Sequence, residues 1–304
     1  MKNRAFIYII LAGVLWGTSG IFVHYLAPLG FSSMQMTGVR GVVSFIALSL
    51  FFLLKDKSVY RVTLPELLIF AAIGAMLYLA AAFYYSSMQL TSVSTAVVLM
   101  YTAPIIVSVF SALFFGEKFT PIKTVAVGVM LVGCALVAGI AGGIAFDPLG
   151  ILFAFGASAT YAGYNILTKW AMRRGSRPES SSIYSFLFMS LIALCASDPV
   201  GTVSTAVKNP WPSVPLLIGL GVCTFVLPYF LYTLSLKHLP AGTASALSII
   251  EPLSATVFSI ILFDEALTVP TGIGIALIIG AVFVLGISDN EKKKEKTVDT
   301  VKAN

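Results

Sequence analysis

The chain has 304 residues, of which 58% are hydrophobic and only 11% are charged, and its formal net charge is +6. Soluble domains carry about 25% charged residues, so this composition excludes a soluble globular protein and indicates an integral membrane protein. A positive net charge also fits nucleic-acid binding, but basic residues gather in the inner loops of any membrane protein. The positions of the basic residues along the chain must decide between these two explanations.

The apolar runs predict an all-α integral membrane protein with ten transmembrane helices, because about 20 apolar residues cross the hydrocarbon core. The first run contains Trp16 and reaches no small-residue cleavage site, so it is predicted to be a retained span and not a signal peptide. Gly, Pro, Ser or charged residues mark most connections. The predicted spans are 5–26, 34–54, 64–87, 93–115, 120–140, 149–170, 181–197, 213–236, 241–263 and 268–288.

The basic residues test this count. With the N-terminus in the cytoplasm, all of the 19 Lys and Arg except Lys208 and Arg40 fall in inner segments. The positive-inside rule therefore predicts a multi-pass plasma-membrane protein with both termini in the cytoplasm, and it excludes a nucleic-acid partner. The basic tail, 291–304, is predicted to be a solvated, disordered cap, with contact to anionic lipid as a modest further possibility.

The chain contains an internal repeat. Aligning Pro104 with Pro252 pairs STAVVLMYTAPIIVSVFSALFFGEKFT with GTASALSIIEPLSATVFSIILFDEALT, which gives 10 identities in 27 positions without a gap. The repeat unit holds five predicted spans, an odd number, so the second copy must be inverted in the membrane. The predicted halves are 1–144 and 145–290, and inverted repeats place a substrate site near the midplane between the halves.

These motifs resemble the EamA family of the drug/metabolite transporter superfamily. The resemblance covers residues 5–288 and rests on the WG of Trp16–Gly17, on Arg40 within GVRGVVSF, and on the paired APIIVSVFSALFFGE and EPLSATVFSIILFDE. It implies a central cavity lined mainly by predicted spans 3, 4, 8 and 9, with spans 1 and 6 beside it. Family members are similar to exporters of amino acids and other small metabolites. The FDE at 263–265 departs from the family pattern, which more often has a Gly before the Glu.

Glu251 and Pro252 are the most unusual residues of an apolar run. Glu251 lies about 15 Å into its span at ~1.5 Å per residue, where a carboxylate is either functional or a protonated group that holds helices together. Pro252 removes the donor for the carbonyl of Ser248, which is expected to be free, and Pro104 makes the equivalent break. Each break either borders a cavity or improves packing.

Other polar side chains are candidates for substrate or proton binding. Arg40, about 10 Å deep, either pairs with Glu251 or extends to the outer interface and holds carbonyl groups. Asn165 is either a ligand or a link between helices. Aromatic residues with polar tips either line the cavity or pack in the core; they are Trp16, Tyr85, Tyr101, Tyr161, Tyr164 and Tyr232.

The sequence favours a secondary active transporter, with a small-molecule substrate, the lipid bilayer and protons as partners. An exporter of small polar metabolites such as amino acids is the first hypothesis, and an exporter of cationic or aromatic drugs is the alternative. An intramembrane enzyme is remote, because no paired aspartates, Ser–His pair or HExxH occurs. No cofactor or metal site is expected, since the three cysteines lack ligand spacing and are expected to be small buried residues. A phosphate-binding GxxxxGK[ST] loop is also missing, so a gradient must drive transport.

Overall fold

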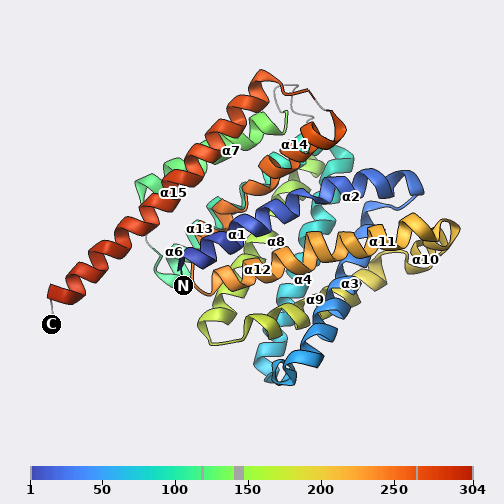
Figure 1. Ribbon diagram of the computed structural model, residues 1–304, viewed down its shortest axis with the longest axis horizontal. Coiled ribbons are helices and arrows are strands. Elements are labelled where there is room, and N and C mark those ends of the chain that lie inside the picture. Colours follow the sequence, from blue (N-terminus) through green and yellow to red (C-terminus); the bar gives the residue numbers. More distant parts are fainter. Residues whose placement is uncertain (1, 118–119, 140–146, 265, 303–304) are drawn as a thin grey trace.

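The computed structural model describes residues 2–117, 120–139, 147–264 and 266–302, and these residues form helices and loops without strands (Figure 1). In the first predicted half the helices are α1 (Lys2–Gly17), α2 (Ser19–Leu26), η1 (Ala27–Leu29), α3 (Ser33–Lys55), η2 (Lys57–Tyr60), α4 (Leu64–Leu90), α5 (Val93–Met100), α6 (Ala103–Phe115) and α7 (Pro121–Val137). In the second they are α8 (Pro148–Arg173), α9 (Pro178–Ala196), α10 (Pro199–Lys208), α11 (Pro210–Gly221), η4 (Val222–Val226), α12 (Leu227–Leu236), α13 (Ala241–Leu247), α14 (Ile250–Phe263) and α15 (Val269–Lys302).

Seven helical segments within the described residues are long and apolar enough to cross a membrane. Two shorter apolar helices, Pro121–Val137 and Val269–Leu285, occupy the predicted fifth and tenth spans. The 26-residue α8 occupies the predicted sixth. The chain is therefore an all-α, multi-pass membrane protein, while the count of ten spans and the inversion of the second half stay predictions.

Two helical segments lie outside the predicted spans. α15 continues beyond its predicted span to Lys302 and projects from the bundle (Figure 1), while the disorder of the tail after residue 290 stays a prediction. Lys and Glu, which dominate this tail, are good helix formers. The connection before the eighth span also contains a helix, α10, which begins where the Asp198 side chain accepts a hydrogen bond from the Gly201 N–H at 2.9 Å.

Side-chain caps fix where several long helices begin. At α3, the Ser32 hydroxyl accepts from the Gln35 N–H, and the Gln35 side chain accepts from the Ser32 N–H, which is a complete capping box. At α8, Asp147 accepts from the Gly150 N–H at 2.7 Å. These caps satisfy N–H groups that have no partner inside the helix, and they set the register of the side chains that follow.

Four of the membrane helices are interrupted near their middle. Thr18 separates α1 from α2, residues 101–102 separate α5 from α6, residues 248–249 separate α13 from α14, and the π-helix η4 separates α11 from α12. Pro104 and Pro252 lie in the first turns of α6 and α14. The expectation of a free Ser248 carbonyl is wrong, because it accepts from the Glu251 N–H at 2.9 Å in a tighter turn.

Helices of the two predicted halves pack against each other throughout the bundle. The long α4 packs against α8 and α9, and α1 packs against α12 and α14. The two last helices of the halves, α7 and α15, form a pair along one side of the molecule (Figure 1). Small residues permit this close pairing, since Gly133 of α7 and Gly274 of α15 lie backbone to backbone.

Candidate functional site

Glu251 lies on α14, directly after the break in its helix. The side chain is half-buried. It interacts with the Tyr101 hydroxyl, which comes from the corresponding break between α5 and α6, and the Arg40 guanidinium attracts it electrostatically. Two broken helices thus bring a carboxylate and a phenol together, and α3 adds a positive charge nearby. Such a group can bind a polar molecule or exchange a proton.

The half-buried Arg40 is only partly satisfied by the protein. Its Nη1 donates to the Tyr85 hydroxyl of α4 at 3.2 Å. Its Nε is buried and has no hydrogen-bond partner among the described residues. A buried guanidinium N–H without a partner is costly, so Arg40 retains a donor that a carboxylate could use.

An aromatic cluster lies beside this group, between α1, α8 and α12. The Trp16 ring is 5.0 Å from the Tyr229 ring and 5.4 Å from the Tyr232 ring, measured between centroids. Tyr164 lies 5.6 Å from Tyr229 and 6.0 Å from Tyr232. Edge-on and tilted pairs at these separations are favourable, so the cluster forms a stable wall in the middle of the bundle.

Tyr161 joins the aromatic cluster to the Glu251 group. It stacks on Tyr164 at 5.9 Å. It also interacts with Ser248, at the helix break, and with Tyr232, and its backbone carbonyl accepts a hydrogen bond from the Asn165 amide. Every predicted binding residue therefore falls in one of two adjoining groups, which lie on broken helices and on the continuous α3, α4 and α8.

Sequence reasoning missed two tyrosines. Tyr229 contacts Trp16 and Tyr164, and its ring lies 4.3 Å from Phe225. Tyr84 interacts electrostatically with Glu251. The spacing of Tyr229 and Tyr232 on one helix, three residues apart, places them on the same face and was the available signal.

Two cavities in the part of the chain that the structure describes differ greatly in size. The larger, about 250 Å³, lies between α6, α7, α13 and α15. The smaller, about 10 Å³, is lined by Tyr164, Tyr229 and Thr233 among others and has room for about one water. Glu251 lines neither of them, so a cavity at Glu251 stays a prediction.

The cysteines do not form a shared site. Cys134 is buried, but Cys195 is exposed and Cys223 is half-buried, so the expectation of three buried cysteines is wrong for two of them. In the described ranges, no three His, Cys, Asp or Glu residues are grouped closely enough to hold a metal ion.

Comparisons with known proteins agree with this architecture. A solved crystal structure superimposes with a TM-score of 0.79 at 20% identity, over 96% of this chain and 99% of that one, which shows a shared fold. An uncharacterized transporter of Archaeoglobus fulgidus is 30% identical, covering 91% of this chain and 94% of its own length. The uncharacterized transporter YwfM of Bacillus subtilis is 24% identical, covering 96% and 97%.

A further relative carries a named activity. The threonine/homoserine exporter RhtA of Escherichia coli K12 is 27% identical, covering 90% of both chains. The model of the EamA-like transporter family matches the chain twice, over residues 3–139 and 148–287. These matches span nearly all of the sequence, so the chain belongs to the EamA-like transporter family.

Proposed function

We propose that the protein is a secondary active exporter of small polar metabolites such as amino acids, working by alternating access and coupled to protons. The observation that carries this proposal is the meeting of Glu251 and Tyr101 at two helix breaks, with Arg40 close by. The relationship to RhtA, whose name is threonine/homoserine exporter, supports the substrate class. In this proposal the protein lies in the plasma membrane with both termini in the cytoplasm.

The charges suit a zwitterion. Arg40 has a buried Nε–H without a partner in the described residues, and a guanidinium binds carboxylates through more than one donor. Glu251 supplies the opposite charge, for an ammonium group or for a proton. A proton on Glu251 and a substrate ammonium would compete for the same carboxylate, and this competition couples proton entry to substrate release.

Polar contacts across the predicted halves support alternating access. At the predicted cytoplasmic end, Arg177 donates to Asp56 at 2.7 Å and Ser176 donates to Glu66 at 2.9 Å. Each pair joins a residue of the second half to a residue of the first. We infer that these contacts hold the cytoplasmic side closed, and that they must break when the transporter opens inward.

The aromatic cluster favours the alternative substrate class. The rings of Tyr229 and Tyr232 each lie within 6.0 Å of both Trp16 and Tyr164, measured between centroids, and such aromatic walls bind organic cations beside a carboxylate. Competition separates the two functions. In the first case amino acids should inhibit transport of labelled threonine, and in the second labelled tetraphenylphosphonium should be transported and amino acids should not inhibit it.

Glu251→Gln tests the proposal, because it keeps the shape and mimics the protonated carboxyl group. In proteoliposomes the variant should still exchange labelled threonine across the membrane, but it should lose accumulation driven by a pH gradient. Asp264→Asn, at the exposed C-terminal cap of the same helix, α14, is the matched control and should accumulate substrate normally. Full pH-driven accumulation by Glu251→Gln would show that the carboxylate has a structural role.

A further inference from the structure

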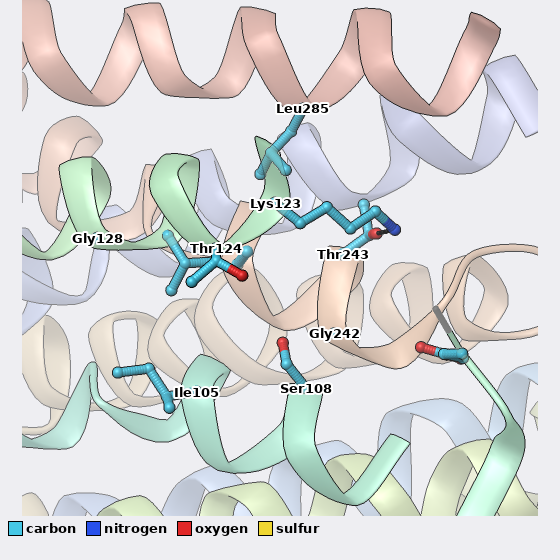
Figure 2. A pocket seen from close by; sticks show the side chains of 11 residues that line it. Ile105, Ser108, Lys123, Thr124, Gly128, Gly242, Thr243 and Leu285 are labelled. Atoms are coloured by element: carbon cyan, nitrogen blue, oxygen red, sulfur yellow. Dashed lines mark hydrogen bonds between the residues drawn. The ribbon is translucent and has the colours of Figure 1, made fainter. Parts of the chain in front are cut away.

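The larger cavity lies apart from the Glu251 group and has no role in the function proposed so far. Figure 2 shows it between α6, α7, α13 and α15, with Ser108 on one wall and Lys123 and Thr124 on another. Its volume of about 250 Å³ is just below the range of ordinary ligand sites, ~300–1,000 Å³. The walls come from both predicted halves, so the cavity lies where alternating access requires movement.

A positively charged and a negatively charged side chain, Lys123 and Glu117, line the α13 end of this cavity. The Lys123 ammonium of α7 donates to the Thr243 hydroxyl of α13 at 2.9 Å (Figure 2). The Glu117 carboxylate, which precedes α7, accepts from the Ala241 N–H at the start of α13, at 3.1 Å. Two charged residues of the first half therefore hold the first turn of a helix of the second half.

The rest of the cavity wall is mainly apolar. Ile105, Val127 and Leu285 supply hydrocarbon from three different helices. Gly128 leaves open space, since no atom lies within 4 Å of where a Cβ would be. The cavity is thus amphipathic, with two opposite charges at the α13 end and an apolar remainder.

We propose that this cavity binds a small zwitterion with an apolar body, an amino acid with an aliphatic side chain, as the loading site on the cytoplasmic side. This inference rests on the proposed exporter function and names the place where substrate enters. The substrate carboxylate would pair with Lys123 and its ammonium with Glu117. The opposite charges at one end favour a zwitterion over an anionic lipid, which Glu117 would repel.

Loading would also act on the fold. A substrate that takes Lys123 from Thr243 and Glu117 from the Ala241 N–H removes two contacts between α13 and the first half. The short α13 leads directly into the break before Glu251. Substrate binding at the cytoplasmic end would thereby loosen the helix that carries the proposed proton site.

The experiment measures binding of labelled L-valine to the purified full-length protein, with two analogues as competitors. L-Valinamide lacks the carboxylate, and 2-hydroxyisovalerate lacks the ammonium group. Each should compete about tenfold more weakly than valine or worse, because each loses a charge-assisted contact. Lys123→Met should weaken valine about tenfold and leave valinamide unchanged, while Glu117→Gln should weaken valine and leave 2-hydroxyisovalerate unchanged.

Further variants separate binding from folding. Lys123→Arg keeps the charge and should keep discrimination against valinamide. Gly128→Leu should fill the cavity and abolish binding, whereas Gly280→Leu, at a glycine of α15 with equally open surroundings, should bind normally. If the wild type binds and transports valine or threonine but Lys123→Met and Glu117→Gln keep full discrimination, the loading site is wrong and the exporter function stands. If the wild type binds and transports neither, both proposals fail.

Discussion

Asn165 of α8 and Tyr232 of α12 form a hydrogen bond in the centre of the bundle, with the Tyr232 hydroxyl donating to the Asn165 Oδ1. Both side chains are completely buried. The Asn165 amide also donates to the Tyr161 carbonyl of its own helix at 2.7 Å. A candidate ligand is therefore occupied by protein groups and links the helix of Tyr161 to that of Tyr232.

This link predicts a coupled loss of stability. Asn165→Leu and Tyr232→Phe should each lower the free energy of unfolding by about 1–3 kcal/mol, because each leaves a buried polar partner unsatisfied. The double variant should lose less than the sum of the two. Thermal unfolding in detergent measures the three variants, and strictly additive losses would contradict the coupling.

Substitution of glycine by alanine should have opposite effects on stability at different positions of α7 and α15, depending on whether the two helices touch there. A Cβ on Gly133 would lie 2.9 Å from the Gly274 carbonyl oxygen, so Gly133→Ala should lower the melting temperature by forcing the helices apart. Gly128 and Gly272 lie on the same two helices with no atom within 4 Å of a Cβ. Alanine at either should raise stability by up to about 1 kcal/mol through helix propensity. Equal effects at all three sites would exclude close backbone packing.

The lowered pKa of Asp56 predicts that the folded state loses stability in acid. Hydrogen bonds from Ser58 and then from Arg177 lower the pKa of Asp56 to about 2, against about 4 in an unfolded chain. A lowered folded-state pKa stabilises the fold above pH ~4, and this contribution is lost as the pH falls from ~4 to about 2.

The test compares melting temperatures of the wild type and Asp56→Asn over this pH range. The wild type should be more stable at pH 6, and the difference should disappear near pH 2. The Arg177 and Asp56 side chains are 41% and 39% exposed, so 1 M salt should shrink the part of the difference that Arg177 supplies. A difference that does not change with pH would contradict the assignment.

Arg40 predicts a selective loss of affinity. Arg40→Ala should reduce binding of carboxylated substrates about tenfold or more, with little change for their amides, and Arg40→Lys should keep part of the affinity. Tyr85→Phe removes only the 3.2 Å contact and is the control for a change in the position of Arg40. If Arg40→Ala lowers stability and binds both substrate types equally, the residue anchors the fold.

The predicted topology can be tested by labelling. In a variant without native cysteines, Lys208→Cys should react with an impermeant thiol reagent from outside the cell. Arg174→Cys should react only after permeabilisation, because the basic residues near it are predicted to be cytoplasmic. Both positions are exposed, so the reverse pattern would overturn the predicted orientation, with both termini in the cytoplasm.

Composition and covalent chemistry made much of this fold predictable. Apolar runs require helices in lipid, and Pro104 and Pro252 cannot donate backbone hydrogen bonds, so helical spans and their two breaks follow from local sequence. The contact of Arg40 with Tyr85 does not follow, because depth in the membrane says nothing about which neighbour lies beside a helix. In the tail, two sequence-based criteria disagree, since its charge density indicates disorder while its individual residues favour a helix.

The π-helix η4 has a consequence for how this sequence can change. A π-turn accommodates an extra residue within an α-helix, and each residue turns an α-helix by about 100°. Loss of one residue from Val222–Val226 would therefore close the bulge into a regular α-turn and leave the rest of the span in register. Loss of one residue from a regular turn between Trp211 and Val222 or within α12 would instead rotate one end of the span against the other and carry Tyr229 or Tyr232 away from Trp16, so single deletions should be tolerated at η4 more readily than beside it.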